Sequence, residues 1–227
     1  MVAKTYLDLF LVITIAFSVA FGQVAKSTQR GSDPDILSRR VMDDESENLT
    51  TTNAINRALA DTRVPGGIVR MRDCTEELAK QRWRPGGASL NDILNAIVQA
   101  DPQYTWQLDN GVINILPTAG EPELLKIRVK KFRVVNATSV TLAYSKLMSL
   151  PEVRQAIVNL GLSDSFERLQ GPPATADDKK GFSIRCKNVT LREALNAIVR
   201  ADRKAVWTYS ENHGNGKHGF AIEFTVR

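Results

Sequence analysis

Cysteine and histidine are scarce in this sequence, and their scarcity restricts the chemistry that the chain can perform. The 227 residues include two cysteines, Cys74 and Cys186, and two histidines, His213 and His218. A structural zinc site takes four ligands, mostly Cys or His, and a catalytic triad needs a histidine oriented beside a nucleophile. The histidines lie in one glycine-rich segment in which Glu211 is the nearest acid. We therefore expect no metal site, no cofactor, no catalytic residues and no enzymatic activity.

The two cysteines allow a single disulfide. An oxidising compartment favours a bridge between Cys74 and Cys186. However, Cys186 alternates with Phe182 and Ile184 in the segment GFSIRCKNV, which also fits a buried thiol on one face of a strand. The sequence leaves both interpretations open.

Long apolar runs are absent except near the N-terminus. Residues 9–21 form an apolar run of 13 residues after Lys4, and Ala20 and Gly22 supply the small residues that signal peptidase requires. A bilayer-spanning helix takes about 20 apolar residues. We therefore expect a cleavable signal peptide over residues 1–22, a periplasmic or otherwise exported protein, and no membrane span after cleavage. An uncleaved anchor is the alternative.

Charge is close to balanced, with 30 Lys and Arg against 25 Asp and Glu, a formal net charge of +5. Nucleic-acid-binding domains gather basic residues on one face, and exported proteins rarely meet nucleic acid, so we do not expect that partner. The segment after the signal peptide is polar, with the motifs RGSDPD and DDESE. This composition predicts a flexible tether over residues 23–47.

One stretch of the sequence occurs twice. Residues 89–101 read SLNDILNAIVQAD and residues 190–202 read TLREALNAIVRAD, and the 21-residue windows around them share nine residues at an offset of 101 positions. In both copies apolar residues recur at the spacing of an amphipathic helix. Each copy also starts with a hydroxyl residue that is followed three positions later by an acid, a pattern typical of a helix N-terminus. The repeat therefore predicts two equivalent helices.

Strand patterns flank both predicted helices. A Trp-containing strand follows each helix (QYTWQL and KAVWTY), then a turn and a last strand, and GGIVRM and GFSIRCKNV predict strands upstream. We predict an α+β fold of two small domains from an internal duplication, each with helices packed on a short, mostly antiparallel sheet. The domains span residues 48–117 and 123–227, and the second includes a long internal loop over residues 163–180.

An asparagine occupies the same position of both repeats, Asn95 and Asn196. Asparagine is a mediocre residue for a helix interior. We predict that it forms a hydrogen bond to the neighbouring strand in both copies; inheritance from a duplicated ancestor is the alternative.

The segment NVTLREAL, residues 188–195, resembles the core of the short N-terminal domain shared by secretins and TonB-dependent receptors (STN-like). The first copy, GASLNDIL at residues 87–94, keeps the hydroxyl, both leucines and the acid of that pattern. The resemblance implies protein–protein contact in the periplasm and supplies no catalytic residues. In that family the domain precedes an outer-membrane β-barrel, which this sequence lacks, so we expect the protein to act in trans.

Two basic segments are candidates for partner binding. The basic residues of the first segment alternate with apolar residues from Leu125 onward, which predicts a strand with a basic outer face. Lys131 breaks this alternation, which predicts a bulge there. The cations of this segment either protect an exposed edge or dock an acidic partner, an anionic lipid or a cell-wall polymer. The second is a predicted loop with an aromatic residue between two arginines. The candidate residues are Lys126, Arg128, Lys130, Lys131, Arg82, Trp83 and Arg84.

The sequence favours a non-catalytic, exported protein-interaction module associated with a cell-envelope machine such as a secretin, a TonB-type transporter or a signalling partner. The alternative is a peptidoglycan- or polysaccharide-binding envelope protein that uses the basic strip and the tryptophan loops. The motif GNGKHG at residues 214–219 matches a phosphate-binding loop by letter. Such a loop needs a helix after it, and a strand pattern follows here, so we predict a hairpin.

Overall fold

The structure is a computed structural model, and several expected segments lie outside the residues that it describes. It describes residues 34–42, 47–70, 80–83, 86–164, 181–214 and 217–226. The expected signal peptide and most of the predicted internal loop are among the residues outside this set. Their predictions therefore stay predictions.

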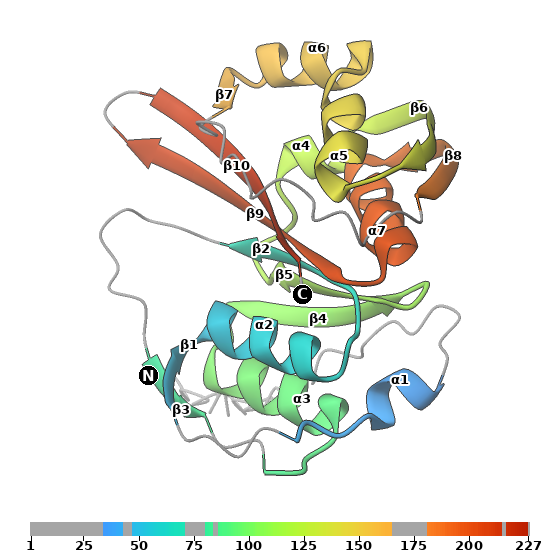
Figure 1. Ribbon diagram of the computed structural model, residues 1–227. Helices are drawn as coiled ribbons and strands as arrows, with labels where there is room; N and C mark the ends of the chain where they lie inside the picture. The colour runs from blue at the N-terminus through green and yellow to red at the C-terminus, as the bar shows by residue number, and fades with distance from the viewer. Residues whose placement is uncertain are drawn as a thin grey trace, which may run out of the picture.

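A mixed six-stranded sheet forms the centre of the molecule (Figure 1). Its strands, in spatial order, are β4 (Tyr104–Asp109), β5 (Val112–Pro117), β2 (Gly66–Arg70), β9 (Ala205–Gly214), β10 (Lys217–Val226) and β7 (Leu162–Asp164). Strand β2 runs parallel to β5 on one side and to β9 on the other. The predicted α+β class is confirmed, and a single sheet joins strands of both halves of the chain.

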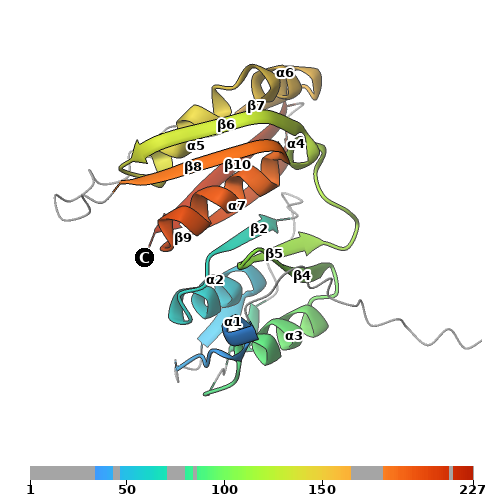
Figure 2. The ribbon, with the colours of Figure 1, turned by 90° about the vertical axis from the view of Figure 1, so that its right-hand side faces the viewer.

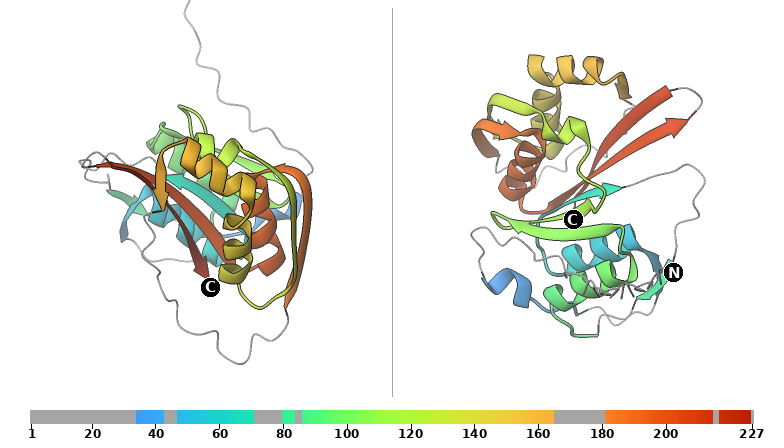
Figure 3. Two further views of the ribbon diagram at one scale, coloured as in Figure 1. Left: turned by 90° about the horizontal axis from the view of Figure 1, so that it is seen from above. Right: turned by 180° about the vertical axis from the view of Figure 1, so that it is seen from behind.

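Helices cover both faces of this sheet (Figures 1 and 3). On one face lie α1 (Pro34–Ser38), α2 (Thr51–Asp61) and α3 (Leu90–Ala100); on the other lie α4 (Glu123–Lys126), α5 (Val140–Met148) and α7 (Leu191–Asp202), with α6 (Pro151–Asn159) next to β7. Two antiparallel ribbons complete the fold: β1 (Glu47–Thr50) with β3 (Lys80–Trp83), and β6 (Arg128–Ala137) with β8 (Phe182–Thr190).

The central strands are buried on both faces. Val206 belongs to the core beneath α2 and α3, whereas its neighbour Trp207 belongs to the core beneath α7. Ile68 and Val69 of β2 divide in the same way. Because side chains alternate between the faces of a sheet, a strand covered on both sides needs a continuous apolar run. This explains why GGIVR in β2 is apolar up to its last residue.

Two glycines in β2 make room for the large side chains that pack on either side of it. A Cβ atom on Gly67 would lie 2.2 Å from the ring of Trp207, which is fully buried. A Cβ atom on Gly66 would lie 2.5 Å from Cδ1 of Leu59, on the opposite face. Glycine is required at these positions by close approach of side chains rather than by backbone conformation.

Both repeat helices form as predicted, and each is capped by its hydroxyl residue. The Thr190 hydroxyl accepts from the Glu193 amide at 3.1 Å, and the Glu193 carboxylate accepts from the Thr190 amide at 2.6 Å, a complete capping box. In α3 the Ser89 hydroxyl also accepts from the Asp92 amide, at 3.2 Å. The shorter Asp92 carboxylate accepts from the Ser89 hydroxyl at 2.6 Å instead.

The predicted hydrogen bond from each repeat helix to its neighbouring strand is confirmed. Trp106 Nε1 donates to Asn95 Oδ1 at 3.0 Å, and Trp207 Nε1 donates to Asn196 Oδ1 at 2.9 Å. Asn196 thus satisfies an indole N–H that would otherwise be buried without a partner, and Asn95 makes the same bond at a more exposed site. Both halves therefore contain the same Asn–Trp hydrogen bond between helix and strand. The origin of the two halves by duplication stays a prediction.

The folded region extends into the segment expected to be a tether. Val41 is fully buried, its amide donates to the Ala88 carbonyl at 3.0 Å, and its carbonyl accepts from the Gly87 amide at 3.1 Å. Helix α2 was also absent from the prediction. Thr50, whose hydroxyl accepts from the Asn53 amide, is the start signal that could have located it.

We expect Gly67→Ala to lower the free energy of unfolding by about 3 kcal/mol, because the new methyl group overlaps a ring that has no room to move. Gly66→Ala is the matched control, and we expect it to cost less because the nearest atom is the end of the Leu59 side chain. Urea unfolding of both variants measures the difference. Equal costs would contradict a specific role for the Trp207 contact.

Removing the asparagine acceptors tests the helix–strand hydrogen bonds. Asn196 is buried, so Asn196→Ala leaves the Trp207 indole without a partner, and we expect a loss of about 2 kcal/mol. Asn95 is exposed, so water can replace it, and we expect Asn95→Ala to cost less than about 1 kcal/mol. Thermal and urea unfolding compare the two; a larger loss at Asn95 would contradict this account.

Candidate interaction surface

The first basic segment does not form one continuous strand. Lys126 ends helix α4, where its ammonium group lies 2.7 Å from the Glu123 carboxylate, and β6 begins only at Arg128. The prediction of a strand from Leu125 is therefore wrong. Leu124 and Leu125 are both fully buried, and a helical turn can bury two adjacent residues that a strand would point to opposite faces.

The pairing of β6 with β8 assembles a cationic surface that the sequence pattern did not predict. Lys131 lies directly opposite Lys187, and Arg133 lies directly opposite Arg185. All four side chains are exposed, whereas the intervening Phe132 and its neighbours on that side face the core. We call this set, Lys131, Arg133, Arg185 and Lys187, the basic face. Figure 2 shows the ribbon that carries it, with β6 and β8 side by side above α7.

Like charges directly opposite each other weaken a strand pair. The basic face contains two such pairs in succession. None of its four cations forms an ion pair with a described residue. Water screens exposed charges, so the repulsion is modest, but no ion pair within the described part of the chain compensates it. An acidic partner would relieve it on binding.

Arg128 and Lys130 of this segment make structural contacts, Arg128 through its side chain and Lys130 through its backbone amide. Arg128 Nη1 donates to the Asn188 carbonyl at 3.0 Å, across the ribbon. The Lys130 amide donates to the Glu152 carboxylate at 3.0 Å, so a side chain of α6 satisfies one N–H on the outer edge of β6. This contact covers one N–H of that edge without using the side chains of the basic face.

The predicted bulge lies farther along the strand than expected. The ladder keeps one register on both sides of Lys131 and shifts between Val134 and Ala137. Val135, just before the shift, is 51% exposed. An apolar side chain therefore lies on the same strand as the cations of the basic face.

The second basic segment lies elsewhere. Arg82 and Trp83 belong to strand β3, opposite Asn48 and Glu47 of β1, so the predicted loop is wrong for these two residues. Arg84 lies outside the described residues. Strands β3 and β6 are at opposite ends of the molecule (Figure 1). The structure therefore does not bring the two predicted basic segments together.

Cys186 has a free, half-buried thiol on the strand face that packs against the core, opposite Phe132. Burial raises the pKa of this thiol, which makes the thiolate less accessible. Cys74 lies outside the described residues, so the bridge to Cys186 stays a prediction.

The glycine-rich segment forms the predicted hairpin, since β9 and β10 run antiparallel up to it. The two histidines lie opposite each other in these strands rather than in the loop. His218 Nε2 is 3.1 Å from a Glu211 carboxylate oxygen, and the Tyr209 hydroxyl donates to the other oxygen. Within the described ranges, no three His, Cys, Asp or Glu side chains gather as they would around a metal ion.

The tryptophans of the two repeats are core residues. Trp106 is 7% exposed and Trp207 is fully buried. The large apolar residues that are exposed in the described part of the chain are Met42, Val135, Leu142 and Val158, none of them aromatic. The repeat tryptophans therefore do not supply an exposed ring on which a sugar could stack.

Comparison of the chain with family models, with curated proteins and with solved structures finds no match. The STN-like resemblance therefore stays an expectation that depends on the repeat residues alone. Among the helices of the described residues, none combines the length and the apolar character needed to cross a bilayer.

A charge-swap cycle tests whether the basic face is electrostatically strained. We expect Arg133→Glu and Arg185→Glu each to raise the free energy of unfolding by about 0.5 kcal/mol at low salt, because each converts a repulsive pair into an attractive one. The double variant places two glutamates opposite each other, which is again a repulsive pair. We therefore expect it to lose the increase in the free energy of unfolding that each single variant shows. Thermal unfolding at two salt concentrations measures the cycle; additive gains in the double variant would show that the pair does not interact.

Proposed function

We propose that the protein is a non-catalytic, exported interaction module that docks an acidic surface of a cell-envelope protein through the basic face. One observation carries the proposal: two directly opposed cation pairs on an exposed strand ribbon. A partner's carboxylates gain Coulomb attraction there and also remove the repulsion within each pair.

The spacing of the basic face fits acidic side chains at alternate positions of an extended segment. Directly opposite residues have Cβ atoms roughly 5 Å apart, so a single carboxylate can contact both cations of a pair. Successive pairs on one face are two residues apart, about 7 Å along the strands. Acids at positions i and i+2 of an extended partner have the same separation. The two arginines also allow bidentate contact with a carboxylate.

Two features favour a protein over a cell-wall polymer as the partner. Val135 offers an exposed apolar contact beside the charges, as protein interfaces commonly have. The sugar-binding alternative uses the basic strip and the tryptophan loops; the repeat tryptophans are buried and offer no ring to a sugar, and the side chain of Trp83 lies outside the described side chains. The resemblance to the secretin and TonB-receptor domain, together with the expected signal peptide, supports an envelope partner such as a secretin, a TonB-type transporter or a signalling protein.

Site-specific photo-crosslinking in the native cell envelope tests this proposal. A photo-reactive residue replaces Val135 beside the basic face, and the matched control replaces Val158 of α6, which is 71% exposed on another element. We expect position 135 to capture one envelope protein with an acidic segment, and position 158 not to capture it. Adding Arg133→Glu and Arg185→Glu should reduce the yield at least about tenfold, because one cation pair becomes a pair of carboxylates and cancels the charge of the remaining Lys131–Lys187 pair.

The other outcomes discriminate between the alternatives. Capture of cell-wall fragments at position 135, abolished by moderate salt, would support the polymer-binding alternative. Equal capture at both positions, or capture that persists in the charge-reversed variant, would overturn the role of the basic face.

A further inference from the structure

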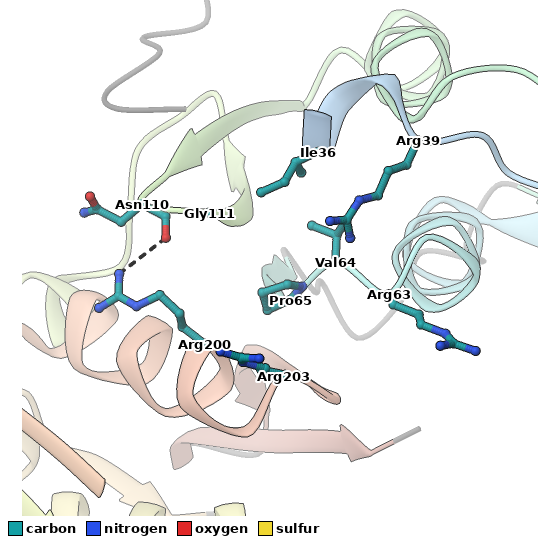
Figure 4. A pocket seen from close by; sticks show the side chains of 9 residues that line it. All are labelled: Ile36, Arg39, Arg63, Val64, Pro65, Asn110, Gly111, Arg200 and Arg203. Atoms are coloured by element: carbon teal, nitrogen blue, oxygen red, sulfur yellow. Dashed lines mark hydrogen bonds between the residues drawn. The ribbon is translucent and has the colours of Figure 1, made fainter. Parts of the chain in front are cut away.

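A cavity of about 720 Å³ lies between the two halves of the chain (Figure 4), and no residue of the basic face is among those that line it. Its walls come from the end of α1, the turn between α2 and β2, the turn between β4 and β5, and the C-terminal end of α7. The residues that line it are Ile36, Arg39, Arg63, Val64, Pro65, Asn110, Gly111, Arg200 and Arg203.

Among the described residues, four arginines and no acid line this cavity. Of the acids close to lining residues in the sequence, the Asp202 carboxylate accepts from the Lys204 amide at 3.1 Å, the Asp61 carboxylate accepts from the Met42 amide, and the Asp109 carboxylate lies 3.9 Å from Arg192. Arginines from separate elements thus surround one space without a matching negative charge in its lining.

Two of the arginines, Arg39 and Arg200, each donate one hydrogen bond to a backbone carbonyl of the described residues. Most of their guanidinium N–H donors are left for a ligand. Arg39 Nη1 donates to the Thr62 carbonyl at 3.1 Å, and Arg200 Nη1 donates to the Asn110 carbonyl at a long 3.4 Å (Figure 4). A guanidinium group has five N–H donors, so both can hold a further oxygen ligand.

The other two arginines have an unfavourable backbone conformation. Among the described residues, five that are not glycine have positive φ. Three are asparagines, which tolerate this region; the other two are Arg63, at φ 54°, and Arg203, at φ 66°, and both line the cavity. A left-handed residue after a helix is usually glycine. Both arginines therefore accept a steric cost at the wall of this space, although the Arg63 side chain points outward, away from the other three arginines (Figure 4).

Helix polarity explains part of this arrangement. Cations are favoured near the C-terminus of a helix, which accounts for Arg200 and Arg203 at the end of α7. The same preference favours Arg39 and Arg63, which follow the C-terminal ends of α1 and α2. It does not require the left-handed backbone of Arg63 and Arg203, which glycine would adopt without strain.

We propose that this cavity binds a small multivalent oxyanion, a ligand whose phosphate or carboxylate groups contact Arg39, Arg200 and Arg203, with Arg63 at the rim adding positive charge. Ile36, Val64 and Pro65 form the apolar part of the wall and leave room for a short hydrocarbon portion. Because the arginines come from both halves of the chain, bound ligand ties α7 to the first half. The site is independent of the basic face.

Thermal unfolding and calorimetric titration of the full chain test the site, with pyrophosphate and citrate as probes and sodium chloride at equal ionic strength as the reference. At a concentration ten times its Kd, we expect an active probe to raise Tm by about 3–6 °C. A response to pyrophosphate alone identifies a phosphate ligand, and a response to citrate alone identifies a carboxylate ligand. No rise with either probe would overturn the proposal.

The double variant Arg63→Gly/Arg203→Gly separates binding from folding. Glycine adopts the left-handed backbone conformation without steric cost, so we expect the Tm of the variant without ligand to be unchanged or higher. Because two guanidinium groups are lost, we expect the probe to bind at least about tenfold more weakly. The matched control, Lys131→Gln/Arg185→Gln, removes the same charge from the basic face and should keep the full response. An equal loss in both variants would show non-specific attraction to net charge and overturn the site.

Discussion

The ring of Trp207 lies against the backbone of Gly67, and the rest of the architecture depends on this contact. The absence of a side chain at position 67 allows β9 to pair with β2 while a buried indole lies across the junction. That pairing joins three strands of the first half to three strands of the second. Both cores are then built on one sheet, and α7 comes to rest over strands of the first half as well as its own.

The two candidate surfaces follow from this shared sheet in different ways. The cavity exists because the sheet brings the end of α7 next to the turns of the first half, so its arginines are gathered by tertiary structure. The basic face lies on a ribbon outside the sheet, where β6 and β8 pair only with each other. One surface therefore depends on how the halves meet, whereas the other depends on a local pairing.

Local features of the fold could be predicted from the sequence, and non-local ones could not. The helices α3 and α7 follow from apolar periodicity and a hydroxyl cap, and the Asn–Trp hydrogen bonds follow from a polar residue repeated within an apolar pattern. The basic face combines residues of β6 with residues of β8, and only the pairing register shows that Lys131 meets Lys187. The arginine cavity gathers positions from 39 to 203, which no local pattern relates.

The parallel pairing of β2 with β9 also determines the order in which the molecule can fold. During synthesis β2 and β5 emerge early, but their second face, which includes Val69 and Val112, is covered only by residues of the later half. Long-range strand pairing of this kind raises contact order and slows folding. The apolar sheet surface of the first half therefore stays exposed until the ribosome has synthesised the second half. Chains with such a surface exposed are prone to aggregate and benefit from chaperones.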